Sequence, residues 1–126
     1  MKKLILIADD NGLVRQLLRT MLEHEGGWEV AGSRDGREAV LKAQELRPDA
    51  VILDFAMPLM DGLAAAREIA KVLPSVPIVL FTMYDSPETT LAAQKAGIAQ
   101  VFPKSGSGQA LIRMVEELME KQSGVQ

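Results

Sequence analysis

The sequence predicts an α/β fold, in which a doubly wound, five-stranded parallel β-sheet lies between two layers of helices. Five short apolar runs alternate along the chain with five longer stretches whose apolar residues recur at helical spacing. Three of the short runs are continuously apolar, as strands are when helices cover both faces of a parallel sheet. Strict alternation of strand and helix favours right-handed crossovers and therefore a three-layer (βα)5 sandwich.

The first elements have clear local signals. The expected strands cover residues 4–8, 28–32, 50–53, 78–81 and 100–102. The first helix carries an apolar stripe from Leu13 to Leu22 and ends at the glycine pair 26–27. The second begins at Asp35, because Asp35 and Glu38 have the spacing of a capping box, and it stops before Pro48.

The other three helices are bounded by glycine, proline and cap residues. They are expected from near Gly62 to Pro74, from the Ser86-Pro87 pair to Gly97, and around the apolar residues between Leu111 and Leu118. We expect residues 1–121 to form one domain and residues 122–126 to be a polar tail or the stump of a linker.

Composition fits a folded domain and excludes several classes of function. The 126 residues are 48% hydrophobic and 25% charged and include no cysteine, which excludes disulfides and thiolate metal sites. The net charge is −3 and no run of Lys or Arg occurs, so we expect no direct binding of nucleic acid. The apolar run near the start is too short for a signal peptide or a membrane span, so a cytoplasmic location without a membrane is expected.

Polar residues follow four of the five expected strands. They are Asp9 and Asp10 after the first, Asp54 after the third, Thr82 after the fourth and Lys104 after the fifth. Because ligands bind beyond the carboxyl ends of parallel strands, we expect these side chains to converge. Clustered carboxylates favour a hard cation such as Mg²⁺, while a lysine and a threonine can contact phosphoryl oxygens. The pattern indicates phosphoryl transfer to an aspartate.

Four motifs, in this order, resemble one known family. They are "ADDN" after the first strand, "LDFAMPLMDG" around the third, "LFTMYD" at the fourth and "FPKS" at the fifth. Together they resemble the receiver domain of two-component response regulators, of the chemotaxis-regulator kind, from Lys3 to about Lys121. The resemblance implies the flavodoxin-like strand order 2-1-3-4-5.

The resemblance also implies a role for each site residue. Asp54 would accept a phosphoryl group from a phosphohistidine on a sensor histidine kinase or phosphotransfer protein, and Thr82 and Lys104 would contact that group. Mg²⁺ would be held by Asp9, Asp10, Asp54 and the backbone carbonyl of Ala56. Pro58 and Gly62 match residues that shape the loop after the acceptor.

The same resemblance implies a signalling switch. Phosphorylation would favour a conformer in which the face of the fourth helix, fifth strand and fifth helix is altered, and this face would signal to an effector domain or partner. Such a domain catalyses only its own phosphorylation and dephosphorylation, so we expect no metabolic enzyme activity.

Two positions depart from the family pattern and keep an alternative open. Val101 stands where an aromatic switch residue is usual, and Ser105 stands where a proline commonly follows the lysine. The alternative is a receiver-like interaction module that works without phosphorylation.

Three further interpretations fit less well. A flavin carrier would need a phosphate loop where Asp9 and Asp10 stand, and a haloacid-dehalogenase-type phosphatase would need an aspartate in place of Ala56. Taken alone, the pair Asp9 and Asp10 could also be a helix cap.

Overall fold

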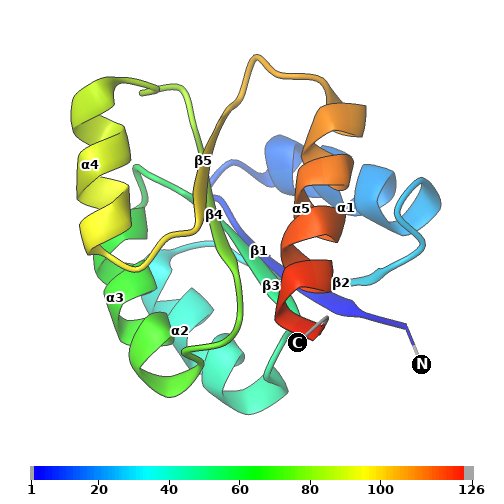
Figure 1. Ribbon diagram of the computed structural model, residues 1–126, viewed down its shortest axis with the longest axis horizontal. Coiled ribbons are helices and arrows are strands. Elements are labelled where there is room, and N and C mark those ends of the chain that lie inside the picture. The colour runs from blue at the N-terminus through cyan, green and yellow to red at the C-terminus, as the bar shows by residue number, and fades with distance from the viewer. Residues whose placement is uncertain (1, 124–126) are drawn as a thin grey trace.

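Five parallel strands form a single sheet in the computed structural model, which describes residues 2–123 (Figure 1). The strands are β1 (Leu4–Ala8), β2 (Glu29–Ser33), β3 (Ala50–Asp54), β4 (Ile78–Thr82) and β5 (Gln100–Pro103). They pair in the order β2-β1-β3-β4-β5. The predicted doubly wound sheet and its strand order are confirmed, and each strand lies within one residue of its expected bounds.

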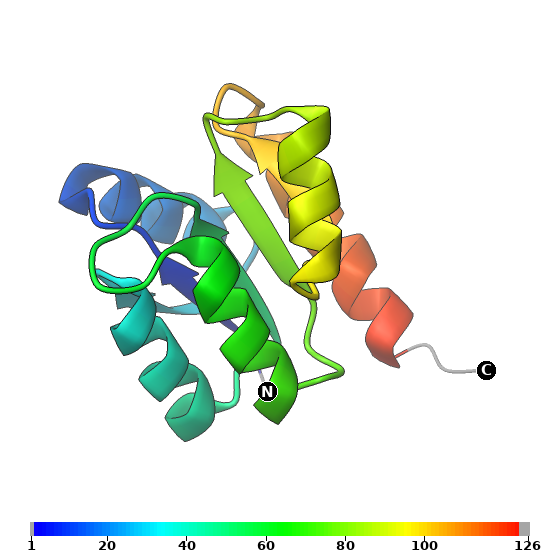
Figure 2. The same cartoon turned by 90° about the vertical axis from the view of Figure 1, so that its left-hand side faces the viewer.

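Within residues 2–123, five helices cover the two faces of this sheet. They are α1 (Gly12–His24), α2 (Gly36–Leu46), α3 (Gly62–Val72), α4 (Pro87–Lys95) and α5 (Gly108–Ser123). Helices α1 and α5 lie on one face, and α2, α3 and α4 lie on the other (Figures 1 and 2). Helix α5 takes in the first two residues of the expected tail, and the rest of that tail, residues 124–126, lies outside the described residues. No helix within residues 2–123 is long and apolar enough to cross a membrane.

The helices begin where their capping residues predict. The Asp35 carboxylate accepts a 2.8 Å hydrogen bond from the backbone N–H of Glu38, and the Glu38 carboxylate accepts one of 2.6 Å from the N–H of Arg34. At α4 the Ser86 hydroxyl accepts a 3.1 Å bond from the Thr89 N–H. These bonds satisfy donors that the first helical turn leaves without partners.

Alternate residues of each strand enter two separate apolar layers. The layer beneath α2, α3 and α4 includes Leu6, Val51, Leu53, Ile69 and Leu80. The layer beneath α1 and α5 includes Ile5, Ile7, Leu22, Trp28, Ile52 and Leu111. In the predicted stripe of α1, Leu13 and Leu17 are 67% and 62% exposed, so the buried face is narrower than the apolar pattern.

The position of β5 at the edge of the sheet explains Pro103. An edge strand tolerates a residue that lacks a backbone N–H. Because neighbouring side chains of a strand point to opposite faces, Val101 packs in the layer under α4 and Phe102 packs in the layer under α5. Among the described residues every peptide bond is trans, including the one between Lys104 and Ser105.

Candidate functional site

Four polar side chains meet at the carboxyl edge of the sheet. Asp9 directly follows β1, Asp54 ends β3, Thr82 ends β4 and Lys104 directly follows β5. These strands are consecutive neighbours in the sheet, so residues up to 95 positions apart in the chain come into contact. The convergence expected from the sequence is therefore present.

Lys104 bridges two buried carboxylates. Its Nζ lies 2.9 Å from Oδ2 of Asp9 and 3.2 Å from Oδ1 of Asp54. The two aspartates are 1% and 7% exposed. The same ammonium lies 5.7 Å from the centroid of the Phe81 ring. A buried carboxylate is costly without a partner, and here one cation serves two of them.

Asp9 and Asp10 do not cap helix α1. The cap is Asn11, whose side-chain oxygen accepts bonds from the N–H groups of Leu13 and Val14 at 2.9 and 3.2 Å. Oδ1 of Asp9 instead accepts a 2.9 Å bond from the Asn11 N–H. The interpretation of the pair as a helix cap is wrong, because the asparagine directly after Asp10 caps the helix.

The third carboxylate, Asp10, is exposed but close. One oxygen from each of Asp9, Asp10 and Asp54 lies within 4.8 Å of the other two. Carboxylate oxygens are the ligands that Mg²⁺ prefers, and a partly open cluster leaves room for the waters that this ion retains. The donor set therefore fits a divalent magnesium ion. The fourth ligand implied by the resemblance, the carbonyl of Ala56, belongs to the exposed turn after β3.

The pKa values of the site follow from burial and crowding. Burial raises the pKa of Asp54, the negative charge of Asp9 raises it further, and Lys104 only partly opposes the two. Burial by itself lowers the pKa of Lys104, but the hydrogen bond to Asp9 and the charges of Asp54 and Asp9 outweigh it, so that pKa is raised. Lys104 thus stays cationic at neutral pH.

Thr82 is held by hydrogen bonds to two neighbouring loops. Its hydroxyl oxygen accepts a 3.0 Å bond from the Tyr84 N–H, and its backbone carbonyl accepts one of 2.9 Å from the Lys104 N–H. The residue is fully buried. A cavity of about 420 Å³ opens beside it, lined by Thr82, Met83, Asp85, Pro103, Lys104 and Ser105. Thr82 and Lys104 thus both border this cavity.

The loop after β3 is shaped by Pro58 and Gly62. The Pro58 carbonyl accepts a 2.7 Å bond from the Met60 N–H across Leu59, whose φ is 71°. A Cβ atom at Gly62 would lie 2.2 Å from the backbone oxygen of Asp54. Only glycine therefore lets α3 start this close to the strand that carries Asp54.

The sequence interpretation overlooked several residues around the site. Asn11 had a recognisable signal, since an asparagine directly before an apolar helical stripe is a typical N-cap. Arg15 donates a 2.7 Å bond to the Asp9 carbonyl, and the rings of Phe55 and Tyr84 are in contact. The Arg15–Asp9 and Phe55–Tyr84 contacts join separate segments, so no local pattern in the sequence indicates them.

Comparisons with known proteins agree with this geometry. The family model described as response regulator receiver domain matches residues 5–116. A protein-glutamate methylesterase/protein-glutamine glutaminase of Alkalilimnicola ehrlichii is 40% identical over 125 residues, which cover 93% of this chain and 32% of the relative. The chain spans about a third of the length of such methylesterase relatives. The chemotaxis protein CheY of Thermotoga maritima is 40% identical over 105 residues, covering 82% of this chain and 87% of the relative.

Solved structures have the same architecture. The chemotaxis protein CheY4 of Vibrio cholerae superposes with a TM-score of 0.88 at 28% identity, covering 94% of this chain and 99% of the other. A CheY-like receiver domain protein of Methanospirillum hungatei gives a TM-score of 0.93 at 24% identity, with 98% of each chain covered. The second likeness concerns the fold alone.

Proposed function

The chain belongs to the response regulator receiver domain family, and on that premise we propose that Asp54 is its phosphoacceptor. The domain is a phosphoacceptor signalling module of the two-component type. One observation carries the assignment of the acceptor: Asp54 ends the central strand β3 and shares the Lys104 ammonium with Asp9. A nucleophilic carboxylate, a fixed cation and a hydroxyl are then all present at one edge of the sheet.

Phosphoryl transfer would proceed on Asp54 with its neighbours in supporting roles. A carboxylate oxygen of Asp54 forms a bond to phosphorus while the P–N bond of a phosphohistidine breaks and the imidazole leaves with the electron pair. The Lys104 ammonium pairs with one phosphoryl oxygen, and the Thr82 hydroxyl donates to another. Catalysis of this kind rests on positioning and charge, which the buried ion pair supports.

A magnesium ion would be held by Asp9, Asp10, Asp54 and the carbonyl of Ala56. When bound, the ion would supply positive charge that offsets the clustered carboxylates and the phosphoryl oxygens. The proximity of the three carboxylates supports this assignment.

The partner that fits this site is a sensor histidine kinase or phosphotransfer protein. The output surface we propose is the face of α4, β5 and α5, read by an effector domain or a separate partner. Residues 1–121 would form the signalling unit, in the cytoplasm, whether or not a longer protein contains it. The domain itself would turn over no metabolite.

The test is the intact mass of the protein after incubation with phosphoramidate, with and without Mg²⁺. We expect one phosphoryl adduct that requires Mg²⁺ and disappears in Asp54→Asn. Asp61→Asn is the matched control, since Asp61 caps α3 in the same loop and should leave the adduct intact. No adduct on the wild type would contradict the proposal and favour the interaction module that works without phosphate.

A further inference from the structure

Two aromatic rings join the loops that flank the site. Phe55 directly follows Asp54, and Tyr84 lies two residues after Thr82. Their ring centroids are 6.0 Å apart with an interplanar angle of 70°, which is an edge-to-face contact. Phe55 also packs against the core layer under α3, whereas Tyr84 is 63% exposed. The contact therefore attaches the loop between β4 and α4 to a ring anchored in the core.

The backbone of Tyr84 holds the Thr82 hydroxyl, and Phe55 is bonded directly to Asp54 in the chain. The Tyr84 N–H donates to the Thr82 hydroxyl oxygen at 3.0 Å. Because the Thr82 oxygen acts as acceptor for Tyr84, its own proton remains available for an oxygen beside Asp54. Any shift of Tyr84 relative to Phe55 would change the position of the hydroxyl relative to the carboxylate.

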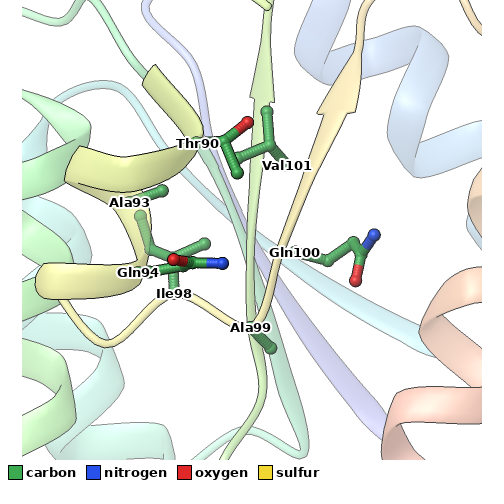
Figure 3. A pocket seen from close by; sticks show the side chains of 7 residues that line it. All are labelled: Thr90, Ala93, Gln94, Ile98, Ala99, Gln100 and Val101. Atoms are coloured by element: carbon green, nitrogen blue, oxygen red, sulfur yellow. The ribbon is translucent and has the colours of Figure 1, made fainter. Parts of the chain in front are cut away.

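The aromatic residue of β5, Phe102, lies in the layer under α1 and α5, where its ring stacks on Phe81. Val101 lines a small cavity of about 90 Å³ between α4 and β5, together with Thr90, Ala93 and other residues (Figure 3). Among the described residues, the ring contacts near the site are Phe55 with Tyr84 and Phe81 with Phe102, and only the first joins two loops of the site.

We propose that the Phe55–Tyr84 contact is a positioning contact that holds the Thr82 hydroxyl in place for phosphoryl acceptance by Asp54. The ring of Phe55 fixes Tyr84, and the Tyr84 N–H fixes the hydroxyl. Neither ring touches the reacting atoms, so both residues act through Thr82. The proposal rests on the assignment of Asp54 as the phosphoacceptor.

The coupling can be measured without phosphate. NMR spectra of the wild type and Phe55→Leu would report the Thr82 methyl signal and the hydrogen exchange of the Tyr84 amide. Phe55→Leu changes no atom of the β4–α4 loop, yet we expect it to shift the methyl signal and speed the exchange. Leu91→Ala, on the exposed face of α4, is the control and should change neither. Unchanged signals in Phe55→Leu would overturn the proposal.

The consequence for the reaction is measured with phosphoramidate and Mg²⁺. Tyr84→Ala should slow formation of the adduct by about two- to tenfold, the range expected for loss of one aromatic contact, and Tyr84→Phe should recover the rate. In a Thr82→Ala background, Tyr84→Ala should have no further effect. An equal effect in both backgrounds, or a faster reaction, would mean that Tyr84 only covers the site and would overturn the proposal.

The two measurements separate this inference from the proposed function. A wild-type protein that forms no adduct contradicts the assignment of Asp54. The NMR comparison would still decide whether the ring contact positions Thr82.

Discussion

At the scale of single residues, the site is governed by an excess of negative charge. Asp9 and Asp54 are buried, Asp10 lies beside them, and Lys104 is the cation that pairs with the two buried groups. Burial and Asp9 together raise the pKa of Asp54 despite that pairing. An ionised Asp54 is therefore less favourable in the folded protein than in the unfolded chain.

Asp54→Asn should consequently stabilise the fold in the absence of Mg²⁺. At neutral pH we expect Tm to rise by about 2 to 6 °C, which corresponds to roughly 1 kcal/mol for a domain of this size. The folded-state pKa is raised, so the neutral form is favoured by folding. The gain in stability of the variant over the wild type is therefore complete above the folded-state pKa of Asp54. This gain disappears as pH falls toward the ordinary pKa of 3.8.

Thermal unfolding followed by circular dichroism at several pH values would test this. The matched control is Asp85→Asn, which removes the same charge from an exposed residue that lines the cavity beside Lys104 and should leave Tm nearly unchanged. A lower Tm for Asp54→Asn at neutral pH would show that the Lys104 pairing outweighs burial and repulsion.

At the scale of elements, the site depends on how closely α3 approaches β3. Asp61 caps the helix by accepting a 2.8 Å bond from the Ala64 N–H, and Gly62 is its first residue. A Cβ at Gly62 would meet the Asp54 carbonyl oxygen at 2.2 Å. A backbone atom cannot rotate away, so either the strand end or the helix must move.

Gly62→Ala should therefore lower the free energy of unfolding by about 1 to 3 kcal/mol. It should also slow formation of the phosphoryl adduct, because the displaced atoms belong to Asp54. Urea denaturation gives the first quantity and intact mass the second. Gly12→Ala is the control: its Cβ would meet only the end of the Arg15 side chain, at 3.4 Å, so it should not destabilise the protein. Equal behaviour of the two variants would contradict this account.

At the scale of the whole molecule, one sheet supports two apolar layers. Trp28, the only tryptophan, lies in the layer under α1 and α5, and Ile69 lies in the layer under α2, α3 and α4. Adjacent residues of every central strand enter opposite layers. Both layers therefore pack on the same strands, and disruption of the packing in one layer also destabilises the strands on which the other layer packs. We expect the two layers to unfold together.

Ile69→Ala should shift the unfolding of both layers equally. The free energy of unfolding should fall by about 2 to 5 kcal/mol, as for other buried isoleucines replaced by alanine. Trp28 fluorescence and far-ultraviolet circular dichroism should report the same urea midpoint, although Trp28 lies on the other side of the sheet. Val72→Ala, on the same helix but 39% exposed, should change stability much less. Separate midpoints for the two probes would indicate independent layers.

The structure also shows which parts of the site depend on local sequence. The bounds of the strands were predictable because each strand is a short apolar run. The starts of α2 and α4 were predictable because Asp35 and Ser86 cap the first turns of their own helices. The exposure of Leu13 and Leu17 was not predictable, because an apolar stripe does not say how much of it another element covers. The contact of Phe55 with Tyr84 was equally hidden, since it joins two different loops.

The fold class, the strand order implied by the family motifs and the set of polar residues at the strand ends could all be predicted from the amino-acid sequence. These follow from alternation of elements and from short patterns that act within a few residues. The bridging of Asp9 and Asp54 by one ammonium, in contrast, becomes visible only in the folded protein. The contact between the rings of Phe55 and Tyr84 likewise becomes visible only there. The physical reason is that such contacts depend on distances between atoms of different loops and strand ends, which the arrangement of the whole sheet and its loops sets.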